Sequence, residues 1–189
     1  MIKVSSKKDA IEKMKKLGLN YFPCDVFDVK NTAEIKKFFD KHNAQEYCMR
    51  NPNRTNGKYY YVNNFEEALK LLPKFKTSVT IDVSYRPYKE DIVLVGDIKL
   101  SKKFGAGTVD LTARTDSEAN QRNIYENPDY NIHASLDEDR VWRIPGFEKI
   151  ASYISEHELY DVIVEFSVYS CKIGIKKENV VISEIRTTF

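Results

Sequence analysis

The sequence predicts an α+β protein, in which helices flank sheets whose strands pair mainly antiparallel. Apolar runs with a period of two, typical of strands, are interspersed with runs of helical spacing. Successive strand runs are joined by short polar turns, and such turns connect antiparallel neighbours. With 189 residues, of which 42% are apolar and 31% charged, the chain is long enough for one packed domain or two small lobes that share a cleft.

The first part of the chain predicts three helices, each preceded by capping residues. Helices are expected at about 7–17, 33–41 and 65–72, after Ser5 or Ser6, Asn31 or Thr32, and Asn64 respectively. Glu67 stands at the capping-box position of the third helix. Short strands are expected at 26–29, 47–50 and 59–62. Residues 19–23 are predicted to be a linker, because Asn20 and Pro23 disfavour regular structure.

The middle of the chain predicts strands at 78–84, 92–100 and 108–113, with a flexible loop at 101–107 (SKKFGAG). Residues 114–140 are polar, so we expect irregular structure there with one helical turn near 119–125. A helix is expected to begin at Pro145. We expect two lobes, an N-terminal one of residues 1–75 and a C-terminal one of residues 76–189.

The last 29 residues predict two strands that carry one carboxylate each. Apolar side chains stand at every second position from Val162 to Val168 and should face a core, which places Glu165 on the opposite face. In the following strand Glu184 and Arg186 are two residues apart, so they share a face. We therefore expect Glu165, Glu184 and Arg186 to meet on one sheet surface.

Two parts of the chain are candidates for binding a phosphorylated ligand. Arg50 ends a strand and is followed by a polar turn that includes Lys58, an arrangement suited to holding phosphates. The alternative, favoured by this stretch alone, is an exposed hairpin with solvated charges. Glu165 and Glu184 could hold Mg²⁺ against a polyphosphate, with Arg186 on the phosphates. The alternative there is a cross-strand salt bridge between glutamate and arginine on an exposed surface.

Several classes of function are not supported. The formal charge of +2 argues against nucleic acid as a partner. The three cysteines form no CxxC pair, so neither a zinc site nor a disulfide framework is indicated, and we expect a reducing, cytoplasmic setting. No apolar run approaches the roughly 20 residues that span a bilayer. GxSxG, HExxH and Walker A motifs are absent.

The order of motifs resembles the nucleotide-binding core of ATP-grasp proteins over about residues 45–188. The segments YCMR, NPNRTNGKYYYV and NFEEALKLL match its order of strand, phosphate loop, strand and helix, and VIVEFSVY with VVISEIRT is similar to its terminal metal-binding strands. Within that superfamily the nearest likeness is to the ATP-binding domain of pyruvate phosphate dikinase and phosphoenolpyruvate synthase. In this chain the usual terminal Glu-x-Asn is Glu-x-Arg.

The resemblance implies an ATP-grasp-like fold of two lobes, with ATP and Mg²⁺ as ligands. It implies that Arg50, Lys58 and Arg186 contact the nucleotide and that Glu165 and Glu184 hold the metal. If the chain is an enzyme, it would be an ATP-dependent phosphotransferase or carboxylate ligase. The alternative is a non-catalytic binding protein on the same scaffold, whose cleft takes a partner protein or a polynucleotide; the near-neutral charge favours the protein.

Overall fold

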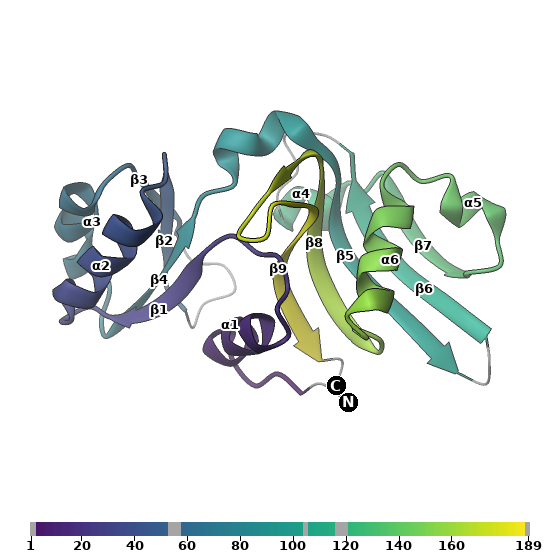
Figure 1. Ribbon diagram of the computed structural model, residues 1–189, viewed down its shortest axis with the longest axis horizontal. Coiled ribbons are helices and arrows are strands. Elements are labelled where there is room, and N and C mark those ends of the chain that lie inside the picture. The colour runs from purple at the N-terminus through teal and green to yellow at the C-terminus, as the bar shows by residue number, and fades with distance from the viewer. Residues whose placement is uncertain (1–2, 53–57, 104–105, 116–120, 188–189) are drawn as a thin grey trace.

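The computed structural model describes residues 3–52, 58–103, 106–115 and 121–187, and it consists of two sheets flanked by helices (Figure 1). The four-stranded sheet has the order β1-β4-β2-β3, and the five-stranded sheet has the order β7-β6-β5-β8-β9. Neighbouring strands in both sheets are antiparallel. The predicted α+β class is therefore confirmed.

The first sheet packs one face against two helices. Its elements are β1 (Cys24–Asp28), α2 (Thr32–His42), β2 (Tyr47–Arg50), β3 (Tyr60–Val62), α3 (Phe65–Leu71) and β4 (Ser78–Val83). Met49 and Ile81 face the helices and are fully buried. The predicted capping box is present: the Asn64 side chain accepts from the Glu67 N–H at 2.9 Å, and Glu67 accepts from the Asn63 N–H at 2.9 Å.

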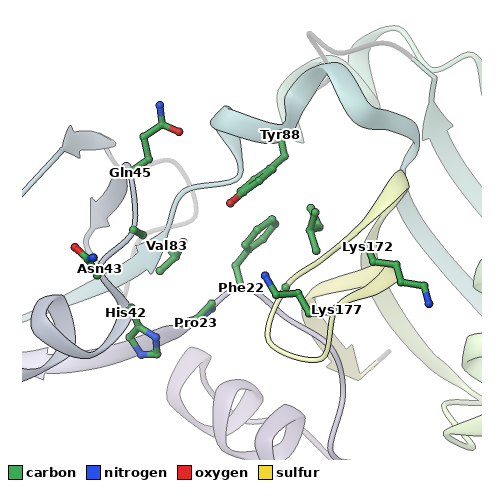
Figure 2. A pocket seen from close by; sticks show the side chains of 12 residues that line it. Phe22, Pro23, His42, Asn43, Gln45, Val83, Tyr88, Lys172 and Lys177 are labelled. Atoms are coloured by element: carbon green, nitrogen blue, oxygen red, sulfur yellow. The ribbon is translucent and has the colours of Figure 1, made fainter.

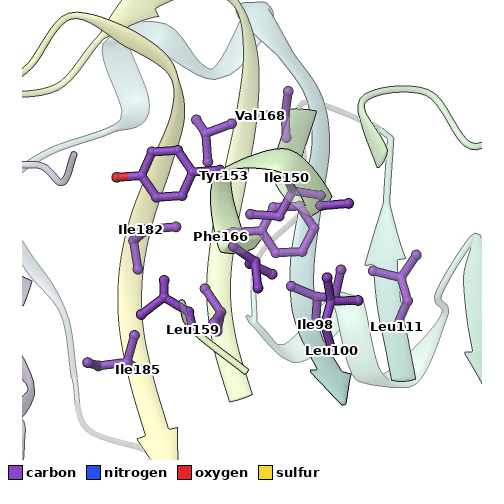
Figure 3. Close-up of a cluster of buried hydrophobic side chains, with 14 of the residues drawn as sticks. Ile98, Leu100, Leu111, Ile150, Tyr153, Leu159, Phe166, Val168, Ile182 and Ile185 are labelled. Atoms are coloured by element: carbon purple, nitrogen blue, oxygen red, sulfur yellow. The ribbon is translucent and has the colours of Figure 1, made fainter. Parts of the chain in front are cut away.

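The second sheet carries the larger core, which lies mainly under α6 (Figure 3). Its elements are α1 (Lys7–Lys16), β5 (Ile92–Lys103), β6 (Ala106–Arg114), α4 (Gln121–Glu126), β7 (Tyr130–Ser135), α5 (Asp139–Trp142), α6 (Phe147–Glu156), β8 (Val162–Ile173) and β9 (Glu178–Thr187). The predicted core positions on β8, from Val162 to Val168, have no solvent exposure at every second residue. The alternation therefore assigns the two faces of β8 correctly.

Helix α1 packs with this second sheet although it precedes the first sheet in the sequence (Figure 1). Ala10, Ile11 and Met14 are buried in the larger core, and α1 lies beside the C-terminal strand β9. The two sheets are connected through a short 3-10 segment, Arg86–Asp91. The division of the chain into lobes at residue 75 stays a prediction.

Two of the expected loops are wrong in part. Strand β5 continues to Lys103 and β6 begins at Ala106, so most of residues 101–107 belong to a hairpin; residues 104–105 lie outside the described chain. The segment 114–140 contains β7 and the first two residues of α5, which were not expected, and it contains α4 near the expected helical turn. Strand β7 is an edge strand, and its exposed Asn131 and His133 alternate with Tyr130, Ile132 and Ala134, which pack against the larger core. This period of two is the strand pattern, so the strand was visible in the sequence.

Candidate functional site

Three carboxylates stand side by side across the second sheet. Asp97 on β5 pairs with Glu165 on β8, and Glu165 pairs with Glu184 on β9. All three lie on the face opposite the α6 core, because the neighbouring Val164 and Phe166 point into that core. Adjacent strands are about 4.8 Å apart, so like charges at these positions repel one another. We call these three residues the carboxylate row.

A β-bulge brings Glu184 onto this face. Glu165 pairs with Glu184 whereas Phe166 pairs with Ile182, so Ser183 is the additional residue in β9. Ile182 and Ile185 are both fully buried although they are three residues apart. The bulge thus allows an apolar residue to face the core on each side of it while Glu184 faces outward. Bulges commonly redirect a side chain in this way beside functional sites.

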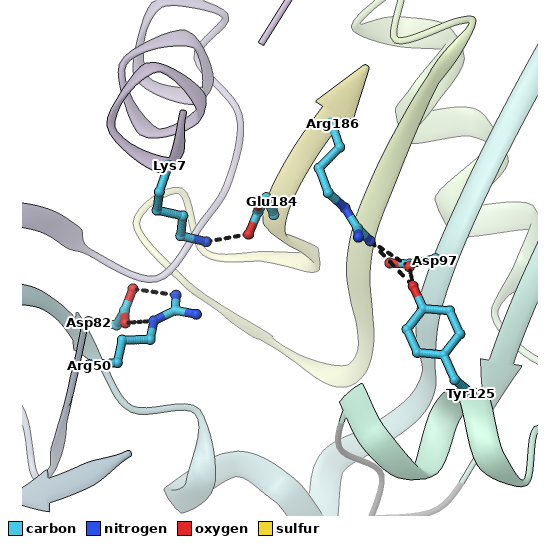
Figure 4. Close-up of polar contacts among 7 residues, drawn as sticks. All are labelled: Lys7, Arg50, Asp82, Asp97, Tyr125, Glu184 and Arg186. Carbon is cyan, nitrogen blue, oxygen red and sulfur yellow. Dashed lines mark hydrogen bonds and ion pairs between the residues drawn. The ribbon is translucent and has the colours of Figure 1, made fainter. Parts of the chain in front are cut away.

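Two cations contact the outer members of the carboxylate row (Figure 4). The Lys7 ammonium, at the start of α1, donates to Glu184 Oε2 at 2.6 Å. Arg186 Nη2 donates to Asp97 Oδ2 at 2.5 Å, and the Tyr125 hydroxyl on α4 also donates to Asp97. Arg186 thus forms a salt bridge with an aspartate two strands away, and Glu184 forms one with Lys7. Each of these residues has a different partner.

The central carboxylate is strongly affected by its surroundings. Burial raises the pKa of Glu165 above its ordinary value, and the charges of Asp97 and Glu184 raise it further against the opposing effect of Lys7 and Arg186. The pKa of Asp97 is also raised, chiefly by burial, with Arg186 acting in the opposite direction. Both pKa shifts thus reflect burial together with the mutual repulsion of the carboxylates.

The first sheet contributes a bidentate ion pair. Arg50, at the end of β2, donates through Nε to Asp82 Oδ2 at 2.9 Å and through Nη2 to Asp82 Oδ1 at 3.2 Å. Burial opposes the charged form, but the Asp82 carboxylate and these bonds raise the pKa of Arg50. The guanidinium is thereby held in one orientation and in its charged form.

The Arg50–Asp82 pair of the first sheet lies beside the Lys7–Glu184 pair of the second (Figure 4), and we call the region between the two sheets at these pairs the gap. Burial raises the pKa of Cys24 to about 12, Asp82 raises it as well, and both Lys7 and Arg50 act to lower it. These interactions place the Arg50–Asp82 pair near the Lys7–Glu184 pair. Of the predicted site residues, Glu165 and Glu184 are opposite each other on adjacent strands, Arg186 is bonded to Asp97 in the same row, and Arg50 comes from the first sheet.

The fifth predicted residue, Lys58, is exposed just before β3 and forms no ion pair with a described residue. Most of the predicted phosphate turn, residues 53–57, lies outside the described chain. The sequence missed Lys7, Asp82, Asp97 and Tyr125. Asp97 had a visible signal, because it is the one acidic residue inside the largely apolar run IVLVGDIKL.

A separate cavity of about 310 Å³ lies between the end of α2 and the β8–β9 turn (Figure 2). The ring of Phe22 stacks on that of Tyr88, with centroids 5.9 Å apart; Lys172 comes from the end of β8 and Lys177 from the turn. None of the residues of the carboxylate row lines this cavity. It is therefore distinct from the gap described above.

One further observation concerns metal ligands at the site, and another concerns the helices of the described chain. Within the described residues, no three His, Cys, Asp or Glu side chains are grouped closely enough to hold a metal ion by themselves. No helix in the described part of the chain has the length and apolar character needed to cross a membrane. A metal at the carboxylate row would thus take part of its ligands from water or from a second molecule.

No protein-family model and no curated protein sequence matches the chain. Solved structures do match, and they are ATP-grasp enzymes. An ADP complex of N5-carboxyaminoimidazole ribonucleotide synthetase has a TM-score of 0.55 at 12% identity, covering 97% of this chain and 44% of that one. A related synthase from Aspergillus clavatus, bound to ADP and a ribonucleotide, has a TM-score of 0.52 at 14% identity, covering 95% and 43%.

D-alanyl-alanine synthetase A from Vibrio cholerae also matches, with a TM-score of 0.52 at 11% identity, covering 96% of this chain and 54% of that one. The chain spans about half the length of these structures. Likeness at this level of identity shows the fold, so the chain has an ATP-grasp-like fold, as the resemblance predicted.

Proposed function

We propose that the chain binds Mg-ATP in the gap between its two sheets. The observation that carries the proposal is that the Arg50–Asp82 pair of the first sheet lies beside the Lys7–Glu184 pair, at one end of the carboxylate row of the second sheet (Figure 4). The likeness to two enzymes whose structures contain ADP supports a nucleotide as the ligand. Arg50, Lys58 and Arg186 would contact the phosphates, and Glu165 and Glu184 would hold the metal.

The two glutamates fit a magnesium ion. They are directly opposite each other on adjacent strands, and both belong to a row that repels itself. Mg²⁺ is commonly held by one or two carboxylates together with phosphate oxygens and water, so it does not need a third protein ligand. When bound, it would neutralise charge on the phosphates that it bridges.

The protein's own part in the proposed reaction is to position the phosphates and to supply positive charge. Arg50 is held in one orientation by its two bonds to Asp82, so it loses little freedom when it contacts a phosphate. Phosphoryl transfer depends mainly on such positioning and on charge stabilisation, and it asks for little covalent chemistry from side chains. The absence of a nucleophile motif is consistent with this mechanism.

We propose a carboxylate ligase, which activates its acceptor as an acyl phosphate. The names of the matched structures, synthetases and ligases, support this class over a phosphotransferase. From the sequence we expect the nearest likeness to be to the ATP-binding domain of pyruvate phosphate dikinase. That likeness would imply phosphotransfer instead, and it stays a prediction. The acceptor would be identified by a screen of carboxylic acids and amines for ADP release.

Thermal unfolding tests the proposed binding directly. A ligand at about 100 times its Kd stabilises the native state by about 2.7 kcal/mol, which corresponds to a rise in Tm of about 5–10 °C for a domain of this size. Glu165→Ala and Glu184→Ala should each abolish the rise. Glu156→Ala, at the exposed end of α6, is the matched control and should retain it.

An unchanged Tm of the wild type with millimolar Mg-ATP would refute the proposed function. Arg50→Ala should weaken nucleotide binding while the protein stays folded. A loss of folding in that variant would instead assign Arg50 a structural role. A rise in Tm that survives in both glutamate variants would show that nucleotide binds elsewhere.

The second candidate function is a non-catalytic binding protein that uses this gap for a partner protein. The specific observation in its favour is that Lys7 and Arg186 already pair with two members of the carboxylate row. Carboxylates that are already paired with cationic side chains attract a metal ion less strongly. This candidate predicts no change in Tm with nucleotide.

A further inference from the structure

Lys7 occupies an unusual position for a lysine near a chain end. Its side chain is only 12% exposed, and its ammonium lies 2.6 Å from Glu184 Oε2. The rest of α1 is fixed, because Ala10, Ile11 and Met14 are buried in the larger core. Helix α1 therefore holds Lys7 in a fixed place beside the carboxylate row.

The contact with Glu184 conflicts with a metal ion at the same carboxylate. An ammonium 2.6 Å from the carboxylate oxygen would lie within a few ångströms of a divalent cation bound there. Two cations at that separation repel strongly in a partly buried site, where water screens them less. The ammonium and the metal therefore cannot both hold Glu184 at full strength.

We propose that Lys7 and a divalent cation exchange at Glu184. In the free protein the ammonium neutralises the carboxylate and keeps it from repelling Glu165, its partner across the strands. When the metal binds, the ammonium leaves Glu184. Because the side chain has four rotatable methylene groups, this exchange requires no movement of α1.

The exchange makes Lys7 a competitor of the metal in the free protein. It also releases a cation beside the gap, within reach of an anionic ligand. Nucleotide-free protein should accordingly bind a metal weakly, and metal and nucleotide should bind better together than separately. The identity of the metal site rests on the proposed function, whereas the competition can be measured without nucleotide.

The test is a titration of the nucleotide-free protein with Mn²⁺, followed by electron paramagnetic resonance of the unbound ion. Lys7→Met removes the ammonium and keeps the length of the side chain. Lys13→Met is the matched control, because Lys13 is on the same helix and pairs with Asp9 instead. The double variant Lys7→Met/Glu184→Gln shows whether any gained affinity belongs to Glu184.

We expect Lys7→Met to bind Mn²⁺ at least about tenfold more tightly than the wild type, the scale of one charged hydrogen bond. Lys13→Met should be unchanged, and the double variant should lose the gain. Equal or weaker binding by Lys7→Met would overturn the exchange, whatever nucleotide does. A gain in Lys7→Met without any effect of Mg-ATP on Tm would uphold the exchange and refute the proposed function.

A measurement on the wild type covers the case in which Lys7→Met does not fold. With ¹³C-labelled lysine, the Lys7 Hε–Cε resonance should move on addition of Mg²⁺, while that of Lys13 stays in place. Lys7→Arg assigns the resonance. A Lys7 signal that is unaffected by saturating Mg²⁺ would overturn the exchange.

Discussion

Replacement of Asn20 by alanine should be among the most destabilising single changes in the chain. Asn20 is fully buried in the segment between α1 and β1. Its Nδ2 donates to the carbonyls of Ile173 at 3.0 Å and Val180 at 2.7 Å, and its Oδ1 accepts from the Lys176 N–H at 2.9 Å. One side chain thus closes the turn that connects β8 and β9, the two strands carrying Glu165 and Glu184.

The expected loss follows from these three bonds. Each is worth about 1 kcal/mol net, and a buried partner left without a bond costs about 1–3 kcal/mol, so Asn20→Ala should lower the free energy of unfolding by about 3 kcal/mol or more. The Tm should fall by about 6–12 °C, since 1 kcal/mol corresponds to about 2–4 °C for this chain length. Asn20→Asp should be at least as harmful, because its carboxylate would face two carbonyl oxygens.

Urea unfolding followed by circular dichroism measures this change. Asn63→Ala is the control, because Asn63 is exposed beside α3 and its side chain forms no hydrogen bond with the described residues. The control should change the free energy of unfolding by less than about 0.5 kcal/mol. A loss below about 1 kcal/mol in Asn20→Ala would refute the reasoning and would show that water replaces Asn20 in the turn.

Two further predictions concern the second sheet. Gly96→Ala should destabilise by about 2–3 kcal/mol in urea unfolding, because its Cβ would lie 2.2 Å from the Thr112 carbonyl oxygen; a loss below 1 kcal/mol would mean that β6 yields easily. Glu165 has a pKa raised above 4.5 in the folded protein, so its ionisation lowers stability as pH rises from about 4.5 through that raised pKa. The free energy of unfolding of Glu165→Gln, relative to that of the wild type, should therefore be higher at pH 7 than at pH 4. An equal difference between the two proteins at both pH values would contradict this.

The sequence could predict which face of a strand a residue occupies, because that depends only on the alternation of its neighbours. Glu165 was placed correctly for this reason, between the buried Val164 and Phe166. Alternation cannot reveal a bulge, so the common face of Glu165 and Glu184 depended on Ser183, an extra residue that no local pattern marks. The prediction was right although its geometric basis was incomplete.

Partners far apart in the sequence could not be predicted. Lys7 and Glu184 are separated by 177 positions, and their contact depends on how α1 packs against β9. Asn20 shows the same limit in another form, since a residue that disfavours regular structure was expected to lie in a simple linker. Its local conformation is irregular, but its side chain is a buried anchor for strands at the other end of the chain.

The charge balance of the site separates nucleotide binding from catalysis. With three carboxylates against Lys7 and Arg186, the row carries a net charge of −1 when Glu165 is ionised. Catalysis requires positive charge directed at the transferred phosphate, and a guanidinium that remains bonded to Asp97 supplies little of it. The proposed binding thus needs only the proposed exchange at Glu184, whereas turnover would also need Arg186 to leave Asp97 or to contact the phosphate through its second Nη group. If the protein binds Mg-ATP but releases no ADP with any acceptor, the exchange at Glu184 takes place whereas Arg186 stays bonded to Asp97.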